Sequence, residues 1–336
     1  MPLGTHESTR SRRPPLMRTF PPLPDLLASD SPDDVLRGHL WLLELVEGTG
    51  LRFRMDDSGL LQFGGPDETY RNLDDAPLAV RPAIRRVRAR FDREALRASV
   101  EDPEAVVFFG VATHHRGIDY DWERLPPFLG AEVWVAEVTA ADESAASTAS
   151  STSSDTSAGA FRPPDAVEAI FDGVGLDPIT AVEREVNARD FAPAAYSIPE
   201  SAWDDGPAAG VVVRNKRGGR GVITGERSGS APTWDGEPTP ATRAGDAGDD
   251  AGAIDRSAAR YATPGRFERA VGSLERDATP VTVGALAERV VEVVARETPA
   301  RFDNRHAPPS LDPDQFRAAA VDLAREFLES GSERPS

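Results

Sequence analysis

The chain has 336 residues, no cysteine, and 56 acidic against 38 basic residues, which gives a net charge of -18 at pH 7. A chain of this length can bury a substantial core in one large domain or two smaller ones. The absence of cysteine excludes a disulfide-linked partner and any cysteine-based metal site. The strong negative charge disfavours general attraction to phosphate backbones, because affinity for nucleic acid depends largely on cationic side chains.

Arginine supplies almost all of the positive charge, since Lys216 is the single lysine in the sequence. This bias, together with abundant Asp, Glu and Ala, is typical of proteins from extreme halophiles. In molar salt the Debye length falls to roughly 3 Å, so repulsion between an acidic chain and RNA is largely screened. The acidity therefore indicates a high-salt habitat and does not by itself exclude RNA as a ligand.

Composition divides the chain into four predicted parts. Residues 1–32 are rich in Pro, Ser and Arg, which predicts a disordered arm. Residues 33–225 form one predicted domain, with a flexible insertion of small polar residues at about 139–160. A disordered linker is expected over 226–256 and a helical C-terminal domain over 257–330. Without a signal-like segment or a long apolar run, the sequence predicts a cytoplasmic protein with no membrane partner.

The stretch from His39 to Phe63 contains two alternating apolar runs, Leu40–Val46 and Leu51–Arg54. They flank the polar, glycine-containing sequence Glu47-Gly48-Thr49-Gly50. This pattern predicts two strands joined by a tight turn as a β-hairpin.

The remaining elements are predicted from the spacing of apolar residues. One amphipathic helix is expected over Val80–Val100, with outward arginines that are either solvated or in contact with an RNA backbone. Strands are expected at Ala105–Phe109, Leu129–Val135, Leu176–Val182, Val211–Val213 and Arg220–Thr224. Helices are expected from about Pro163, and at Ala258–Val271, Val283–Arg296 and Asp314–Leu328, with a charged helical turn at Glu183–Arg189.

Several short motifs follow one another in a definite order. They are Glu47-Gly48 after the first strand, Phe109-Gly110, Tyr120-Asp121-Trp122, Phe128–Trp134, and Gly210 followed by Val211-Val212-Val213-Arg214. This order resembles the ATP-dependent RNA ligases, members of the covalent nucleotidyltransferase superfamily. The resemblance implies an α+β fold: an adenylation domain of antiparallel sheets with flanking helices, followed by a small helical domain.

The resemblance also implies a reaction. In that family a lysine amine attacks the α-phosphate of ATP and holds AMP as a phosphoramidate. The AMP then passes to the 5′-phosphate of RNA before a 3′-hydroxyl closes the nick. ATP and magnesium are therefore the implied cofactors, and RNA is the implied partner.

The positions that carry this chemistry in the family hold other residues here. Leu45 stands at the position of the nucleophilic lysine, Val111 at that of the ribose-binding glutamate, and Ala209 at that of the metal-side glutamate. Gly65 or a neighbour replaces the phosphate-binding arginine, and the last strand lacks its paired lysines. Leucine offers no nucleophile, and arginine cannot substitute because its guanidinium stays protonated.

The main hypothesis is therefore a catalytically degenerate RNA-ligase-like protein that binds RNA ends, a nucleotide or a partner. Its predicted nucleotide- or RNA-binding residues are Glu47, Gly48, Arg52, Phe109, Gly110, Gly210, Arg214 and Lys216, with Arg54, His114, Arg116, Arg217 and Arg220 as further contacts. One alternative is an active enzyme that uses Lys216 as a relocated nucleophile or a non-covalent mechanism. Another is an interaction protein without nucleotide chemistry. The adjacent His114-His115 lacks a third ligand at suitable spacing, so no metal site is predicted.

Overall fold

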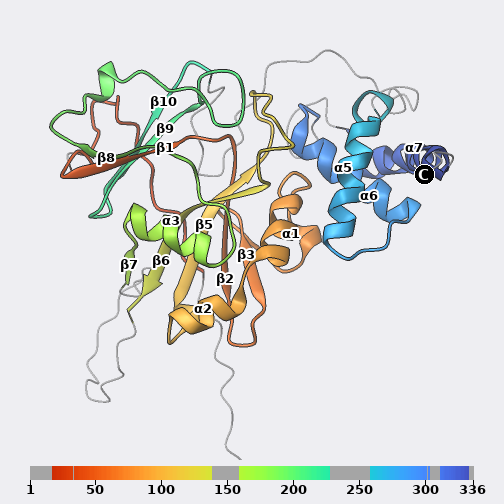
Figure 1. Cartoon of the computed structure of the whole chain (residues 1–336), viewed down its shortest axis with the longest axis horizontal. Helices are drawn as coiled ribbons and strands as arrows, with labels where there is room; N and C mark the ends of the chain where they lie inside the picture. Colours follow the sequence, from red (N-terminus) through yellow and green to blue (C-terminus); the bar gives the residue numbers. More distant parts are fainter. Residues whose placement is uncertain are drawn as a thin grey trace, which may run out of the picture.

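A computed structural model describes residues 17–32, 34–137, 159–227, 258–300, 302 and 311–332. The predictions for residues 1–16, 139–158 and 228–256 lie outside these ranges. The described chain forms two antiparallel sheets, helices that cover one of them, and a C-terminal group of helices (Figure 1). The predicted α+β class with antiparallel sheets is confirmed. No helix within the described ranges is long and apolar enough to cross a membrane.

The first sheet, called sheet A, has the strand order β10-β9-β1-β8. Its strands are β1 (His39–Glu44), β8 (Ala181–Asn187), β9 (Gly210–Asn215) and β10 (Arg220–Thr224). Alternation along β1 sends Leu40 and Leu42 to one face, while Trp41 and Leu43 point toward the second sheet. Both faces of β1 are therefore buried, which explains its nearly continuous apolar sequence.

The second sheet, called sheet B, has the order β4-β3-β2-β5-β6-β7. Its strands are β2 (Gly48–Met55), β3 (Leu61–Gly64), β4 (Thr69–Tyr70), β5 (Val106–Thr113), β6 (Phe128–Ala136) and β7 (Gly159–Phe161). Leu51, Phe53 and Met55 of β2 enter the main core, so Arg52 and Arg54 lie on the opposite face.

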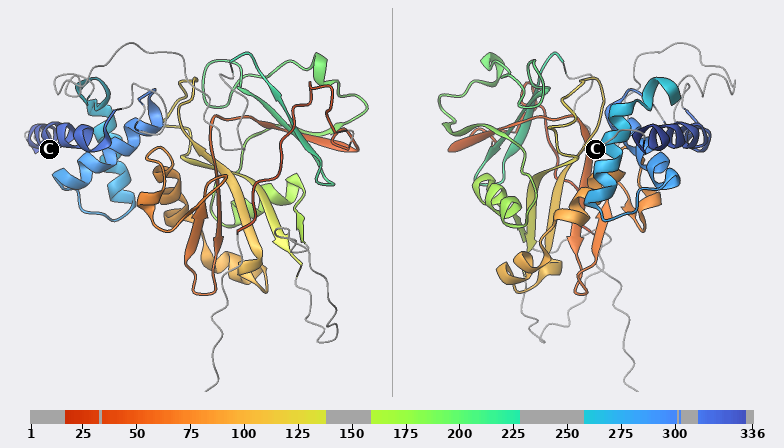
Figure 2. Two further views of the ribbon diagram at one scale, coloured as in Figure 1. Left: turned by 180° about the vertical axis from the view of Figure 1, so that it is seen from behind. Right: turned by 45° about the vertical axis from the view of Figure 1, so that its right-hand side comes forward.

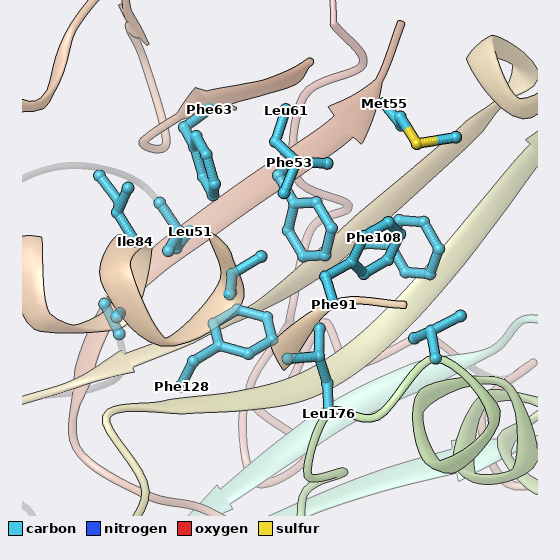
Figure 3. Packing of buried hydrophobic residues seen from close by; sticks show 14 of the residues in the cluster. Leu51, Phe53, Met55, Leu61, Phe63, Ile84, Phe91, Phe108, Phe128 and Leu176 are labelled. Atoms are coloured by element: carbon cyan, nitrogen blue, oxygen red, sulfur yellow. The ribbon is translucent and has the colours of Figure 1, made fainter. Parts of the chain in front are cut away.

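Three helices cover the core face of sheet B: α1 (Arg81–Arg90), α2 (Arg93–Ser99) and α3 (Pro164–Gly173). Short 3-10 turns lie at Leu73–Asp75, Pro103–Ala105 and Pro193–Ala195. In the core between them, Phe53 stacks on Phe108 with ring centroids 4.9 Å apart, and Phe91 meets both rings edge-on (Figure 3). This aromatic cluster anchors the helices to the sheet.

The predicted hairpin over His39–Phe63 is wrong. β1 lies between β8 and β9 in sheet A, whereas β2 lies between β3 and β5 in sheet B. Both edges of each strand are already paired, so neither strand is available to the other. The short connection between Glu44 and Gly48 instead carries the chain from one sheet to the other. The actual hairpin joins β2 to β3.

Three further expectations differ from the structure. The helix over Val80–Val100 is divided in two, because Asp92 caps α2 by accepting hydrogen bonds from two backbone amides. The predicted helical turn at Glu183–Arg189 is mostly strand β8, and the expected strand at Leu176–Val182 begins only at Ala181. Strand β7 pairs with β6 from Gly159, at the end of the predicted insertion.

The C-terminal group contains α5 (Pro264–Arg276), α6 (Val283–Glu297) and α7 (Pro313–Ser332). Both views of Figure 2 show it beside α1. Arg85 of α1 donates two hydrogen bonds of 3.0 Å to the buried carboxylate of Glu292 in α6. The arginines of α1, expected to be either solvated or in contact with RNA, are thus partly used within the fold, since Arg86 also pairs with Asp177 at 2.8 Å.

Residues 17–26, called the strap, begin on the face of sheet B that the helices leave uncovered, where Met17 and Phe20 pack. They end at sheet A, where Asp25 forms a bridge with Val222 of β10. Met17, Phe20, Leu23 and Leu26 recur at every third position and are all buried or partly buried. Such a spacing suits an extended, proline-rich chain with three residues per turn. This part of the predicted disordered arm therefore packs on the domain.

Candidate functional site

The structure brings Leu45, Val111 and Ala209 together in one buried apolar cluster between the two sheets. Gly210 closes the same cluster, because its carbonyl accepts a 3.0 Å hydrogen bond from the amide of Leu45. A side chain at Gly210 would place its Cβ 2.3 Å from the carbonyl oxygen of Ile223. The positions that resemble the ligase nucleophile and glutamates therefore do converge, but they pack as hydrocarbon.

Glu47 lies beside this cluster and organises the connection after β5. Its carboxylate accepts hydrogen bonds from the amides of Arg116 (3.2 Å) and Ile118 (3.0 Å). Its own amide donates to the hydroxyl of Tyr120 at 3.1 Å, and burial raises the pKa of that hydroxyl. Arg116 also donates to the carbonyl of Gly48 at 3.1 Å. These contacts give Glu47, Gly48 and Arg116 structural roles at the edge of the site.

Sequence reasoning missed Glu44, the last residue of β1 and a neighbour of Leu45. Its buried carboxylate accepts hydrogen bonds from the hydroxyl of Ser201 (2.6 Å) and the amide of Ala202 (3.1 Å). Burial is the largest effect on this group and raises its pKa. The signal was an acidic residue at the end of an otherwise apolar strand. Glu44 thereby holds the loop at residues 199–207 over the end of the apolar cluster.

Two buried arginines of sheet A share one carboxylate of sheet B. Arg214 lies 2.6 Å from Glu132 and also donates to the carbonyls of Ala131 (3.1 Å) and Arg162 (3.0 Å). Arg220 lies 3.6 Å from the other oxygen of Glu132 and 4.2 Å over the ring of Phe161. Burial is the main cause that lowers the pKa of both guanidinium groups. Two guanidinium groups therefore face one carboxylate between the sheets.

The remaining predicted residues of sheet B serve packing or internal hydrogen bonds. Phe109 is fully buried, and an added Cβ at Gly110 would lie 2.3 Å from the carbonyl oxygen of Leu129. Arg52 donates to the carbonyl of Pro66 at 3.1 Å, and Arg54 donates to Gln62 at 3.0 Å. A Cβ at Gly65 would lie 2.5 Å from the hydroxyl oxygen of Tyr70.

Lys216 is not brought to this cluster. Its ammonium nitrogen lies 2.6 Å from Glu185 and 3.3 Å from Asp165, and the hydrogen bond with Glu185 is the largest cause that raises its pKa. It follows β9 at the end opposite Gly210, so a six-residue strand of roughly 20 Å separates it from the Leu45 end. Arg217 is exposed in the same turn.

The predicted histidines and acidic residues between β5 and β6 have local partners. The Nε2 atom of His114 lies 2.8 Å from the hydroxyl of Thr49. Asp119 accepts from the indole of Trp122 at 3.0 Å, and Asp121 accepts from the amide of Glu123 at 3.2 Å. Within the described ranges, no group of three or more His, Asp or Glu side chains is placed to hold a metal ion.

ATP and magnesium do not fit the residues present. A cavity of about 20 Å³ lies between the sheets, lined by Pro21, Leu23, Leu43, Ala131, Glu132, Ile179, Val212, Arg214 and Arg220. This volume holds about one water molecule. The carboxylates of Glu44 and Glu47 beside the apolar cluster accept hydrogen bonds within the fold, and the cluster itself supplies no oxygen ligand for a magnesium ion.

No protein-family model matches the sequence, and no curated protein matches it. Two solved forms of an archaeal ATP-dependent RNA ligase are similar at 14% and 13% identity, with TM-scores of 0.41 and 0.42. They cover 93% and 95% of this chain and 64% and 68% of their own. A mutant Naegleria gruberi RNA ligase with ATP and Mn is similar at 12% identity and a TM-score of 0.39, over 58% of this chain and 52% of its own. The chain thus spans from 52% to 68% of the length of these proteins.

Proposed function

We propose that this chain is an RNA-ligase-like protein that does not form lysyl-AMP and acts by binding RNA. The carrying observation is the single buried apolar cluster made by Leu45, Val111 and Ala209. A nucleophile and two carboxylates at these positions would face the same small volume. Replacing them with hydrocarbon removes a cost of desolvation, and it removes the electrostatic groups that phosphoryl transfer requires.

The arrangement of Lys216 gives less support to an active enzyme with a relocated nucleophile. An amine must lose its proton to attack phosphorus, and two carboxylates favour the protonated form of this one. Strand β9 also separates Lys216 from the apolar cluster at the other end of the sheet.

The excess of buried arginine over carboxylate supports RNA as the ligand. Arg214 and Arg220 share Glu132, and the ring of Phe161 lies 4.2 Å from the guanidinium of Arg220. Cationic groups next to aromatic faces are the means by which proteins bind single strands without strong sequence preference. An interaction protein without affinity for nucleic acid is the alternative that a binding experiment separates.

The test begins with α-labelled ATP and magnesium in molar salt, followed by a denaturing gel, with an active ATP-dependent RNA ligase as positive control. We expect no label on this chain while circular dichroism shows that it is folded. A labelled band that disappears in a Lys216→Ala variant would overturn the proposal. Titration with single-stranded RNA in the same buffer then tests binding, and a folded chain without affinity for RNA would favour the interaction-protein alternative.

A further inference from the structure

The face of sheet B beneath the strap is aromatic and cationic. Phe109, Trp134 and Phe161 lie on it in one cluster from three neighbouring strands, and the ring centroids of Phe109 and Phe161 are 5.7 Å apart. Arg220 reaches this face from sheet A and stacks on Phe161. We call these four residues the strap groove. The groove therefore offers flat rings and positive charge side by side.

The strap fills this groove mainly with two side chains. The guanidinium of Arg18 lies 4.8 Å from the ring centroid of Trp134 and 5.6 Å from that of Phe161. Phe20 meets Phe109 edge-on at 5.1 Å, and its ring lies over Gly50, where an added Cβ would be 2.8 Å away. Arginine and an aromatic ring thus occupy the positions at which two stacked bases would lie.

The backbone of the strap is tied down near its C-terminal end. The amide of Leu26 donates to the carbonyl of Val222, and the amide of Val222 donates to the carbonyl of Pro24, both at 2.9 Å. Prolines at positions 21, 22 and 24 have no amide hydrogen to donate. The strap can therefore lift at Arg18 and Phe20 while it stays attached at Leu26.

The positive charge of Arg18 is repelled by the other arginines near the groove. Arg220 of the groove and the neighbouring buried Arg214 share the carboxylate of Glu132, and Arg18 adds a third positive charge. After burial, the charge of Arg18 contributes to the lowered pKa of Arg220. A polyanion in the same place would be attracted to Arg220 where Arg18 is repelled. Electrostatics therefore favours phosphate over the Arg18 side chain at this site.

We propose that the strap groove is a binding site for single-stranded nucleic acid and that the strap competes with the ligand for it. Bases stack on the exposed rings once Phe20 and Arg18 leave, and phosphates pair with Arg220. This inference rests on the proposed function and adds to it the location of the site and a built-in competitor. Rings from three strands favour stacked bases over an acidic peptide, which would need no aromatic row.

Two strap variants of the full chain make opposite predictions. Phe20→Ser weakens the hold of the strap, so affinity for a fluorescent ten-nucleotide uridine RNA should rise about fivefold as the open state becomes more populated. Arg18→Glu places a carboxylate beside Arg220, which tightens the strap and should lower affinity about fivefold. Arg276→Glu, which makes the same charge change at an exposed site on α5, serves as the control and should bind as the unaltered chain does.

Hydrogen exchange of the strap supplies a second measurement. Adding the RNA should speed exchange of the Arg18–Leu23 amides and leave α5 unchanged. Binding with no change in strap exchange, or equal affinity in both strap variants, would overturn the strap groove as the site while leaving RNA binding intact. Release of the strap by a poly-glutamate peptide but not by RNA would overturn the inference as well. A folded Phe20→Ser chain without any RNA binding would overturn both the inference and the RNA-binding part of the proposed function. A labelled lysyl-AMP band is the separate outcome that removes the proposed function.

Discussion

The guanidinium of Arg296, near the end of α6, lies 5.0 Å over the ring of Trp122 in the connection between β5 and β6. It donates to the carbonyl of Leu125 at 2.6 Å and to the carbonyl and hydroxyl of Thr113, both at 3.2 Å. Burial lowers the pKa of Arg296 to about 10, so the group still carries its charge near neutral pH. Arg296 is therefore a buried link between the helical group and the β-domain, in addition to the pair of Arg85 with Glu292.

Replacing Arg296 should loosen this fastening. In Arg296→Met the acceptors of Thr113 and Leu125 lose their donor while the side chain stays apolar and similar in length. We expect the free energy of unfolding to fall by about 2–4 kcal/mol in chemical denaturation. Arg325→Met is the control, because Arg325 makes an exposed pair with Asp322 on α7 and should cost less than about 1 kcal/mol. Equal losses in the two variants would contradict a fastening role.

Glu44 should give the chain a measurable pH dependence. Burial raises its folded pKa above the unfolded value, so the folded state binds the proton more tightly. The stability that follows is fully present below the unfolded pKa near 4.5 and is lost as pH rises through the folded pKa. Glu44→Gln cannot ionise, so its free energy of unfolding relative to the original chain should rise as pH increases above about 4.5. Urea denaturation in molar salt from pH 4 to pH 8 measures the difference, and a constant difference over that range would exclude the effect.

Gly110 should tolerate no side chain. An alanine Cβ would lie 2.3 Å from the carbonyl oxygen of Leu129 and 2.4 Å from the ring of Phe128, and the backbone atom cannot move without breaking the β5–β6 pairing. We expect Gly110→Ala to destabilise the chain by about 3 kcal/mol or more. The matched control is Gly284→Ala in α6, where the added methyl has open space and should stabilise by up to about 1 kcal/mol. Thermal unfolding of both variants decides, and similar melting temperatures would refute the close approach at Gly110.

Local sequence signals identified most elements but not their partners. The strands at β5, β6, β9 and β10 and the helices α6 and α7 follow from apolar periodicity, which depends on neighbouring residues alone. The predicted hairpin was wrong because strand pairing depends on residues far apart in the sequence. β1 pairs with β8 and β9, which lie more than 130 residues away. β8 was missed because its charged residues resemble an exposed helix, although Val182 and Val186 alternate toward the core.

The candidate site shows the same division. Motif order selected Leu45, Val111 and Ala209 as related positions, and the structure places all three in one buried cluster. Glu132, Glu44 and the strap were not predicted as parts of the site. A lone carboxylate in an apolar strand is a signal for the first two, because a buried charge requires a partner. The strap has a signal as well, the recurrence of large apolar residues at every third position between prolines.

Restoring the nucleophile alone should not restore adenylylation. In Leu45→Lys the new amine enters a cluster in which Val111 and Ala209 supply no carboxylate and all three side chains are buried. Burying an unpaired ammonium lowers the pKa of the lysine and should destabilise the chain by about 3 kcal/mol or more. We expect no label from α-labelled ATP in this variant, measured in molar salt beside Leu45→Met, which keeps the volume apolar and should cost less than about 1.5 kcal/mol. A labelled Leu45→Lys protein would mean that the cluster opens to admit ATP, and that the missing amine is the only barrier to the first step of ligation.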